Sequence, residues 1–351
     1  LAAFELTTGK KLWQSDFENP SPEKNTTYVS RAAPTPVADA NGFIAFYEGG
    51  LVAAVTLNGK PRWQRDLVKD YGAIKARHGL ASSLEQTEDR VFCWVERGEA
   101  PYILALNKKT GETIWKSDGL GATTWSSPRL IPTKDGRHLV CSAIGKIAAF
   151  DPKDGMRLWT FHGISSNSSC TPIPVGDGRF LIGASDGRGA QASGQGAASN
   201  GLIKITKQDD GTYAADFVWR AKRATSSFAS PVATDERACF INRSGILFQL
   251  DLATGKELSA TRLETGGVWA TPLAIGDHLY VFGFKGTTAV LTLSKSEVIA
   301  QNRLWEAPQT APGGRPSFGG GGPTLYAASV SGRWLIMRRG DILYAATSSA
   351  K

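Results

Sequence analysis

One phrase recurs along this chain and constrains its fold more than any other feature. It runs from a short apolar segment through a polar turn to a tryptophan four residues after the turn glycine, with copies at residues 1–13, 52–63, 103–115 and 147–159. Six of the ten tryptophans stand near the end of such a phrase, at positions 13, 63, 115, 159, 219 and 305. Self-similarity at a spacing of roughly 40 to 60 residues indicates a ring or stack of equal units.

Each phrase predicts two antiparallel strands joined by a tight turn. The apolar segment has the length and pattern of a buried strand. The turn ends in a glycine, which suits a backbone position of positive φ; these are Gly9, Gly59, Gly111, Gly155 and Gly255. The tryptophan closes the second strand, where its ring can cover the neighbouring unit and bury roughly 200 Å².

Two further strands precede each phrase, so every unit is expected to hold four antiparallel strands. Examples of such pairs are residues 36–47 and 128–141. No segment of 12 or more residues has the apolar period of a helix. Four-stranded blades repeated six or more times predict an all-β protein, a β-propeller that protects its sheet edges by closing into a ring. We expect residues 1–351 to form a single propeller domain.

The number of blades depends on which strands are counted. Eight segments resemble the third strand of a blade, including residues 1–6 and 341–346, but only seven resemble complete pairs of first and second strands. We favour eight blades, the first of them incomplete at the N-terminus, with the natural protein continuing upstream. The alternative is seven blades, in which residues 11–17 complete the blade of residues 323–346.

Composition argues against several functional classes. The chain has 40 Lys and Arg against 32 Asp and Glu, a net charge of +8, but these charges are dispersed and lack the interleaved aromatics of a nucleic-acid module. The sequence has no run of 18 apolar residues, the length that a membrane-spanning helix needs. The four cysteines are isolated, three of them at similar second-strand positions, so we expect buried thiols and no metal site.

The repeated phrase resembles the pyrroloquinoline-quinone (PQQ) repeat of quinoprotein propellers. Close copies of that family's pattern are residues 251–256 (Asp-Leu-Ala-Thr-Gly-Lys) and 107–112 (Asn-Lys-Lys-Thr-Gly-Glu). The resemblance covers nearly the whole chain. Within the superfamily the chain is most similar to secreted bacterial PQQ-binding-like propeller repeat proteins, and it is similar to the propeller lipoprotein of the outer-membrane β-barrel assembly machinery.

The same resemblance bears on cofactors. Quinoprotein alcohol dehydrogenases hold PQQ and a calcium ion, and they carry a pair of adjacent cysteines and a catalytic Asp. This sequence has no adjacent cysteines and no cluster of Glu, Asn and Asp that would suit a hard cation. We therefore expect no cofactor, and PQQ with calcium is the alternative.

A candidate binding site lies in the polar loops that precede the first strands, such as residues 123–128, 225–231 and 267–272. In a propeller each such loop runs from the outermost strand of one blade to the innermost strand of the next, at one mouth of the central channel. The candidate residues at this funnel mouth are Arg31, Trp125, Ser126, Asn167, Ser168, Arg223, Phe228 and Trp269. The alternative is structural, because hydroxyl residues before proline are good turn formers.

These observations favour a binding protein over an enzyme. No Gly-x-Ser-x-Gly motif is present, and the four histidines offer few candidates for acid-base catalysis. We expect a non-catalytic, periplasmic or secreted scaffold that binds a protein, peptide or glycan in the funnel or at its rim, without nucleic acid. The alternatives are a PQQ-dependent dehydrogenase with atypical ligands and a sensor domain of a longer chain.

Overall fold

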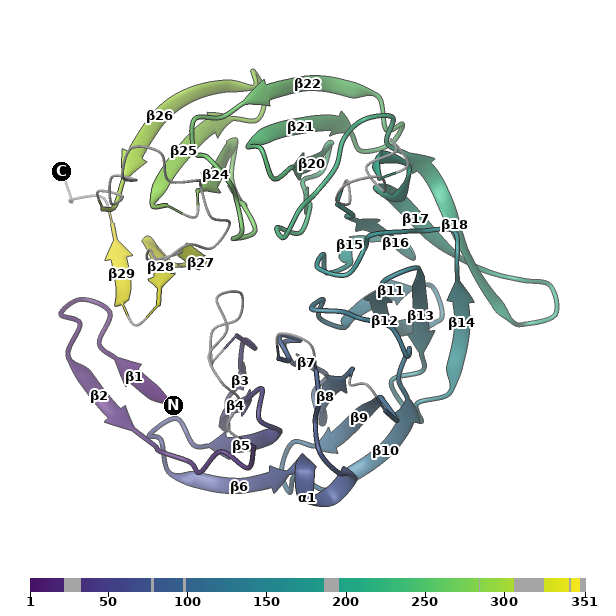
Figure 1. Cartoon of the computed structure of the whole chain (residues 1–351), viewed down its shortest axis with the longest axis vertical. Coiled ribbons are helices and arrows are strands. Elements are labelled where there is room, and N and C mark those ends of the chain that lie inside the picture. Colours follow the sequence, from purple (N-terminus) through teal and green to yellow (C-terminus); the bar gives the residue numbers. More distant parts are fainter. Residues whose placement is uncertain are drawn as a thin grey trace, which may run out of the picture. The chain divides into compact units, whose positions relative to one another are not determined.

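The computed structural model describes residues 1–21, 33–76, 79–96, 99–185, 196–283, 285–305, 325–340 and 342–347. The chain forms two compact units: unit 1 comprises residues 1–164, 176–178 and 205–215, and unit 2 comprises residues 165–175, 179–204 and 216–351. Both are built from antiparallel sheets in which neighbouring strands follow one another in sequence, the pattern of β-propeller blades (Figure 1). The all-β fold of four-stranded blades is therefore confirmed.

Unit 1 holds three four-stranded blades and one hairpin. The hairpin is β1 (Ala2–Phe4) and β2 (Lys11–Gln14). The blades are β3 (Val37–Asp39), β4 (Gly42–Phe46), β5 (Leu51–Val55) and β6 (Pro61–Asp66); β7 (Glu85–Gln86), β8 (Arg90–Val95), β9 (Tyr102–Asn107) and β10 (Thr113–Asp118); and β11 (Arg129–Thr133), β12 (Gly136–Ala143), β13 (Lys146–Phe150) and β14 (Arg157–Phe161). The first strands of these blades lie on one side of unit 1 and the last strands on the opposite side (Figure 1). A short helix, α1 (Leu67–Tyr71), follows β6.

Unit 2 contains the remaining blades, and the tips of the first of these are grouped with unit 1. The blades are β15 (Ile173–Gly176), β16 (Arg179–Ile182), β17 (Gly201–Lys207) and β18 (Tyr213–Arg220); β19 (Val232–Ala233), β20 (Arg237–Ile241), β21 (Ile246–Asp251) and β22 (Glu257–Arg262); β23 (Leu273–Ile275), β24 (His278–Phe282), β25 (Thr287–Thr292) and β26 (Glu297–Arg303); and β27 (Leu325–Ser331), β28 (Trp334–Arg339) and β29 (Ile342–Ala346). A single 3₁₀ turn, η2 (Ala197–Ser199), precedes β17.

The structure has seven blades, so the prediction that favoured eight is wrong. Among the described strands six sheets have four strands and one, β27–β29, has three. The eighth third-strand segment, residues 1–6, forms only the hairpin β1–β2. Counting third strands overestimated the number, because a blade also needs its first and second strands and the sequence holds only seven such pairs. The seven-blade alternative expected residues 11–17 to complete the blade of residues 323–346. The strand within residues 11–17 is β2, and it pairs with β1.

The turns of the repeated phrase have the predicted backbone. The phrase glycine adopts positive φ in each of the five copies, from +71° at Gly9 to +79° at Gly59. In four copies the residue four positions earlier accepts the N–H of that glycine, as Asp151 O does from Gly155 at 2.9 Å, and at Gly59 the acceptor is Thr56 O, three positions earlier. The side chain of Asp151 also caps the turn by accepting the N–H of Lys153 at 2.7 Å. The polar residue that begins the turn and the glycine in the left-handed conformation together close the hairpin.

Four of the six phrase tryptophans dock on the turn of the next blade, as predicted. The indole of Trp115 lies against Gly155 so closely that a Cβ there would be 2.5 Å from the ring, and Trp115 Nε1 donates to Pro152 O at 3.1 Å. Equivalent contacts are those of Trp13 with Gly59 and Leu57 O, of Trp63 with Gly111 and Lys108 O, and of Trp219 with Gly255 and Leu252 O. Glycine is thus required at this position for two reasons: its backbone has positive φ, and the indole leaves no room for a Cβ.

Trp159 and Trp305 pack differently: no described glycine of the next blade lies against either indole, although Trp305 contacts the next blade as predicted. Trp159 Nε1 donates to Nδ1 of His138 at 3.1 Å, and the His138 ring meets Tyr213 edge-on at 4.5 Å between centroids. Trp305 stacks on Tyr344 of β29 with centroids 6.2 Å apart. The β17–β18 turn of the next blade holds Gly211 at positive φ, but an added Cβ there would meet nothing within 4 Å, so no indole rests on this glycine.

The hydrophobic core lies between successive blades. Strand β21 illustrates this, because alternate residues face opposite neighbours. Leu247 packs with Leu279 and Leu291 of the following blade, whereas Leu250 packs with Leu202 of the preceding blade. Both faces of the middle strands are therefore buried, and positions at the loops between blades are fixed by packing on either side.

Candidate functional site

The hydroxyl residues that precede the first strands hydrogen-bond from one blade to the next. In unit 1 the N–H of Thr35 donates to Ser83 Oγ at 3.0 Å, and the N–H of Ser83 donates to Ser127 Oγ at 2.9 Å. Each of these residues stands two positions before the first strand of its blade. The hydroxyl therefore satisfies a backbone donor of the preceding blade.

Unit 2 repeats this arrangement. The N–H of Thr171 donates to Ser230 Oγ at 3.0 Å, and the N–H of Ser230 donates to Thr271 Oγ1 at 3.2 Å. The structural alternative raised from the sequence holds for these hydroxyls, although their partner lies in the next blade rather than in the same turn. The aromatic residues of the same loops have no part in this pairing, and they remain the candidates for contact with a ligand.

In unit 1 the loop before β11 encloses Ser126 and leaves Trp125 half-buried. The N–H of Ser126 donates to Thr124 Oγ1 at 3.0 Å, and the Thr124 hydroxyl donates to Ser142 O at 2.8 Å. Ser126 has no exposed surface, so it positions the loop and does not reach solvent. Arg31, the candidate from the first blade, lies outside the described residues.

A buried carboxylate that sequence reasoning missed holds the start of the same loop. Glu96, directly after β8, accepts the indole N–H of Trp94 at 2.9 Å and the backbone N–H groups of Leu120 and Gly121. Burial raises the pKa of Glu96, and these hydrogen bonds partly offset the rise. The signal in the sequence was an acidic residue at the end of an apolar strand, a place where a charge needs partners.

In unit 2 the structure brings two of the predicted residues together. The rings of Phe228 and Trp269, from the loops before β19 and β23, lie with centroids 4.9 Å apart at an angle of 51°, and both side chains are half-buried. Asn167 is fully buried, whereas Ser168 is half-buried. The Phe228–Trp269 pair thus offers a partly exposed aromatic surface of the kind found at binding sites.

Arg223 lies apart from this aromatic pair. Its Nε donates to Glu257 Oε2 at 2.7 Å, and the two residues form an ion pair. Glu257 begins β22, the outermost strand of its blade. The guanidinium is also 5.8 Å from the ring of Phe248. These contacts direct Arg223 toward the outer strand.

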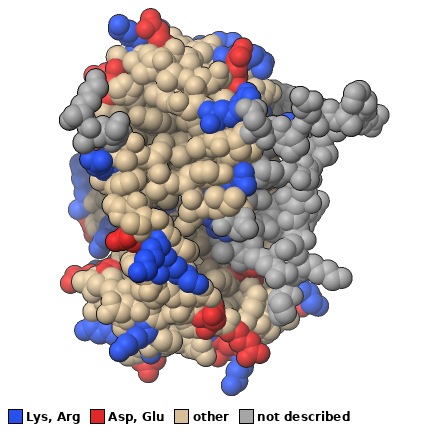
Figure 2. Space-filling view, turned by 90° about the vertical axis from the view of Figure 1, so that its left-hand side faces the viewer, with Lys and Arg blue, Asp and Glu red and all other residues tan. Residues whose placement is uncertain are grey.

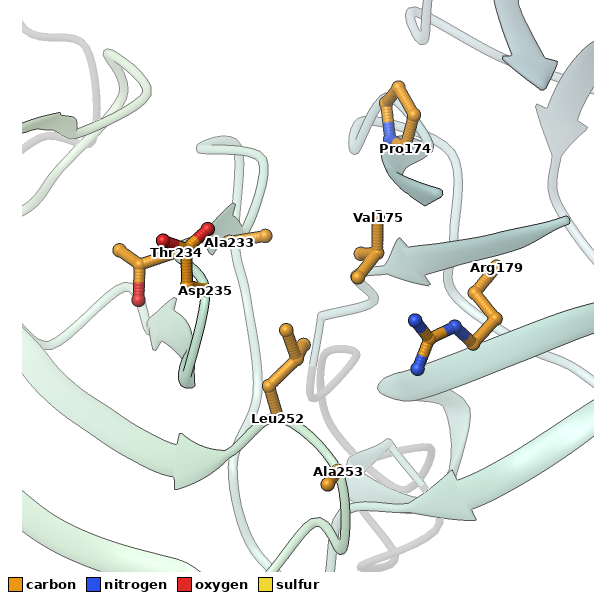
Figure 3. A pocket seen from close by; sticks show the side chains of 8 residues that line it. All are labelled: Pro174, Val175, Arg179, Ala233, Thr234, Asp235, Leu252 and Ala253. Atoms are coloured by element: carbon orange, nitrogen blue, oxygen red, sulfur yellow. The ribbon is translucent and has the colours of Figure 1, made fainter. Parts of the chain in front are cut away.

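A pocket of about 350 Å³ opens in unit 2 between blades β15–β18 and β19–β22. Arg179 and Val175 stand on one side of it, Thr234 and Asp235 on the other, with Leu252 between them (Figure 3). Its lining residues are Pro174, Val175, Arg179, Ala233, Thr234, Asp235, Leu252 and Ala253. The lining combines apolar residues such as Leu252 with the opposite charges of Arg179 and Asp235, which suits a small polar molecule or a peptide side chain. Sequence reasoning missed this pocket because its residues come from three separate turns.

The described residues offer little for metal or thiol chemistry. No group of three or more His, Cys, Asp or Glu within them could hold a metal ion. The four cysteines are free and buried, as expected. Burial raises the pKa of Cys170 and of Cys239 to about 12, so both thiols stay protonated and are poor nucleophiles at neutral pH.

Charge is spread over the surface in small groups. On the side of the molecule that carries β26 and β29, Lys and Arg stand among Asp and Glu rather than in a patch of one sign (Figure 2). Opposite charges pair locally, as Lys207 does with Asp135 at 3.1 Å. Within the described part of the chain, no helix is long and apolar enough to cross a membrane.

Comparisons with known proteins place this geometry in context. The sequence model of a family described as outer membrane protein assembly factor BamB matches residues 1–258 and again residues 99–333. A curated relative of that name from Shewanella oneidensis is 22% identical over 298 residues, which cover 80% of this chain and 70% of the relative.

Two solved structures are similar in fold. BamB from Moraxella catarrhalis superposes with a TM-score of 0.60 at 16% identity, over 87% of this chain and 78% of that one. A europium-containing methanol dehydrogenase superposes with a TM-score of 0.55 at 12% identity, over 87% and 75% of the two chains. An assembly factor and an enzyme thus share the fold, so fold alone does not decide the function.

Proposed function

The chain belongs to the family of outer membrane protein assembly factor BamB, and from this premise we propose that it is a non-catalytic scaffold that binds protein partners during outer membrane protein assembly. The observation that carries this proposal is the family match, which extends from residue 1 to residue 333 of the 351. Scaffolding also suits the construction of the blades, because docked indoles and buried strands hold the loops between them in place.

We assign partner binding to the loops that precede the first strands, at Phe228 and Trp269 in unit 2 and at Trp125 in unit 1. Aromatic side chains supply a large contact area and lose little conformational entropy on binding. The hydroxyl pairs beside them, such as Ser230 with Thr271, fix the backbone that carries the rings. A protein partner would present an extended segment or an apolar side chain to each of these surfaces.

The proposal includes no cofactor. The alternative is a PQQ-dependent dehydrogenase, and the described residues offer neither an adjacent cysteine pair nor an acidic group that fits calcium. Addition of PQQ and calcium tests the choice. We expect no bound quinone absorption and no dye-linked alcohol oxidation, and either signal would favour the dehydrogenase.

We propose that the protein acts in the periplasm, at the outer membrane, because an assembly factor of that membrane must meet its partners there. The secreted location that the sequence also allowed has no corresponding support. Fractionation of the native bacterium tests the location: the protein should be found with the outer membrane and periplasm, and its recovery from culture medium alone would contradict the proposal.

Site-specific crosslinking in the native bacterium tests the function itself. A photoreactive phenylalanine analogue at Trp269 should give a covalent adduct with a protein of the outer membrane assembly machinery, identified by mass spectrometry. The matched control carries the same analogue at Val298, which is 47% exposed on the outer strand β26 of the same blade. Equal adducts at both positions, or adducts only with glycans, would contradict a protein-binding mouth.

A further inference from the structure

The contact between blades β19–β22 and β23–β26 has no tryptophan of the repeated phrase, because the outer strand β22 carries none. In all four indole interfaces the tryptophan ring lies on a glycine of the next blade, and in three of them a third-strand alanine is paired in register with the tryptophan, as Ala105 is with Trp115. We use the term serine interface for the contact between blades β19–β22 and β23–β26 in unit 2. Here the tryptophan, glycine and alanine positions all carry other residues.

Serines replace both the tryptophan and the glycine at the serine interface. Ser259 stands four residues after Gly255, where the tryptophan stands in the other phrases. Ser296 stands at the glycine position, because its N–H donates to Thr292 O at 2.8 Å just as the N–H of Gly255 donates to Asp251 O. Ser296 keeps the positive φ of the glycine, at +59°. The Ser259 and Ser296 hydroxyls hydrogen-bond to each other at 3.1 Å.

The two replacements depend on each other. At Gly255 an added Cβ would lie 2.5 Å from the indole of Trp219, so an indole interface excludes any larger residue at that position. Serine at position 259 has no ring, which leaves room for the Cβ of Ser296. A residue other than glycine at positive φ is otherwise uncommon.

The third change introduces an unsatisfied polar group. Gln249 occupies the alanine position and is paired in register with Ser259. Gln249 is fully buried, and neither its amide oxygen nor its amide nitrogen has a hydrogen-bond partner. A buried polar group without a partner disfavours the closed state, because water would satisfy it on opening. Thr292, whose backbone oxygen accepts the N–H of Ser296, also has a buried hydroxyl oxygen without a partner.

The opposite end of the serine interface remains well connected. Beside the mouth loops, Ser230 N–H donates to Thr271 Oγ1 at 3.2 Å, and the Ser227 hydroxyl donates to Val268 O at 3.4 Å. On the turn side, besides the serine pair, Arg237 Nη2 donates to Ser294 O at 3.2 Å. The apolar core between the two blades lies between these ends.

We propose that the serine interface is an adjustable joint within unit 2. Blades β19–β22 and β23–β26 separate reversibly at their turn ends, where no indole holds them, while the mouth loops stay hydrogen-bonded. Opening gives the amide of Gln249 access to water. Phe228 and Trp269 belong to the two blades that the joint connects, so a partner that contacts both rings binds across it. This inference stands independently of the partner's identity.

Hydrogen exchange of the whole chain, read by mass spectrometry, tests the joint through β22, an edge strand that pairs only with β21 and frays more readily when its packing on the next blade is lost. In the wild-type protein we expect the amides of β22 to exchange at least tenfold faster than those of β6 and β10, the equivalent outer strands of two indole interfaces. Equal protection of β22, β6 and β10 would overturn the proposal.

A variant that restores the chain's own repeat provides the decisive comparison. The triple substitution Gln249→Ala, Ser259→Trp, Ser296→Gly rebuilds an indole interface, and exchange in β22 should slow at least tenfold while β10 is unchanged. Ser259→Trp alone should not slow it, because the new ring would meet the Cβ of Ser296. The proposal fails if the triple variant leaves β22 unchanged or slows all strands equally.

A disulfide keeps the test open if the triple variant does not fold. The hydroxyls of Ser259 and Ser296 are 3.1 Å apart, so Ser259→Cys with Ser296→Cys can be bridged. The four native cysteines are buried and free, and they should not interfere. Exchange in β22 should be at least tenfold slower in the oxidised than in the reduced form of this variant. The same rate in both forms would show that the joint does not open.

Discussion

Replacement of Trp115 by alanine tests the packing on which the whole fold depends. Trp115 is 8% exposed, so nearly all of its side chain is held between blades β7–β10 and β11–β14. A buried indole of roughly 200 Å² at about 25 cal/mol per Å² corresponds to about 5 kcal/mol, an upper value because unfolded chains already bury part of this area. The lost hydrogen bond to Pro152 O contributes about 1 kcal/mol more. With partial collapse of the site, we expect a loss of about 3–5 kcal/mol.

Urea unfolding followed by circular dichroism measures this loss. The matched control is Ile114→Ala, because Ile114 is the preceding residue of the same strand but is 41% exposed. The control should change the free energy of unfolding by no more than about 0.5 kcal/mol. A loss below about 1 kcal/mol for Trp115→Ala, or similar losses for both variants, would refute indole docking as the main contact between these blades.

Three further predictions address other features. Gly255→Ala should destabilise by at least about 1 kcal/mol more than Gly211→Ala in urea unfolding, because both glycines have positive φ but only the first would bring a Cβ against an indole, that of Trp219; equal losses would contradict this. Burial lowers the pKa of His138 below its usual 6.5, so the unfolded chain binds a proton that the folded chain does not, and stability should fall as the pH drops below about 6.5. His138→Gln should weaken the dependence of the free energy of unfolding on pH in this range. The same dependence in the variant and the wild type would contradict a role for His138. Trp125→Ala should leave the free energy of unfolding within about 1 kcal/mol and lower the yield of partner crosslinking; severe unfolding would mean that Trp125 belongs to the core.

The fold was largely predictable from the sequence because its requirements are local. A glycine such as Gly111 is needed for a left-handed turn, and the tryptophan four residues later, Trp115, lies on the adjacent blade, so both recur with the period of the structure. The number of blades was less accessible. Residues 1–6 satisfy the third-strand pattern as well as any other copy, and only the strands found beside them show that they form a hairpin.

The candidate site was less predictable because its side chains depend on partners distant in sequence. Ser126 reads as an exposed loop residue, yet Thr124 and the backbone of β12 enclose it. Arg223 reads as a mouth residue, yet Glu257, 34 residues away, draws it toward the outer strand. Phe228 and Trp269 were identified individually, but their mutual contact at 4.9 Å follows only from the packing of two blades.

Departures from the repeat are the part of the sequence that carries information beyond the fold. Ser296 alone would be an unexplained residue at positive φ, and Gln249 alone an unexplained buried amide. Together with Ser259 they form a consistent set, because loss of the indole permits a Cβ at position 296, and Gln249 is paired in register with Ser259. A tryptophan at position 259 would meet the Cβ of Ser296, as the indole of Trp219 would meet a Cβ at Gly255, so serine at one position is compatible with serine at the other. An interface kept closed at all times would gain stability from a satisfied residue at position 249, and the retention of an unpaired amide there is the reason to expect that this interface opens.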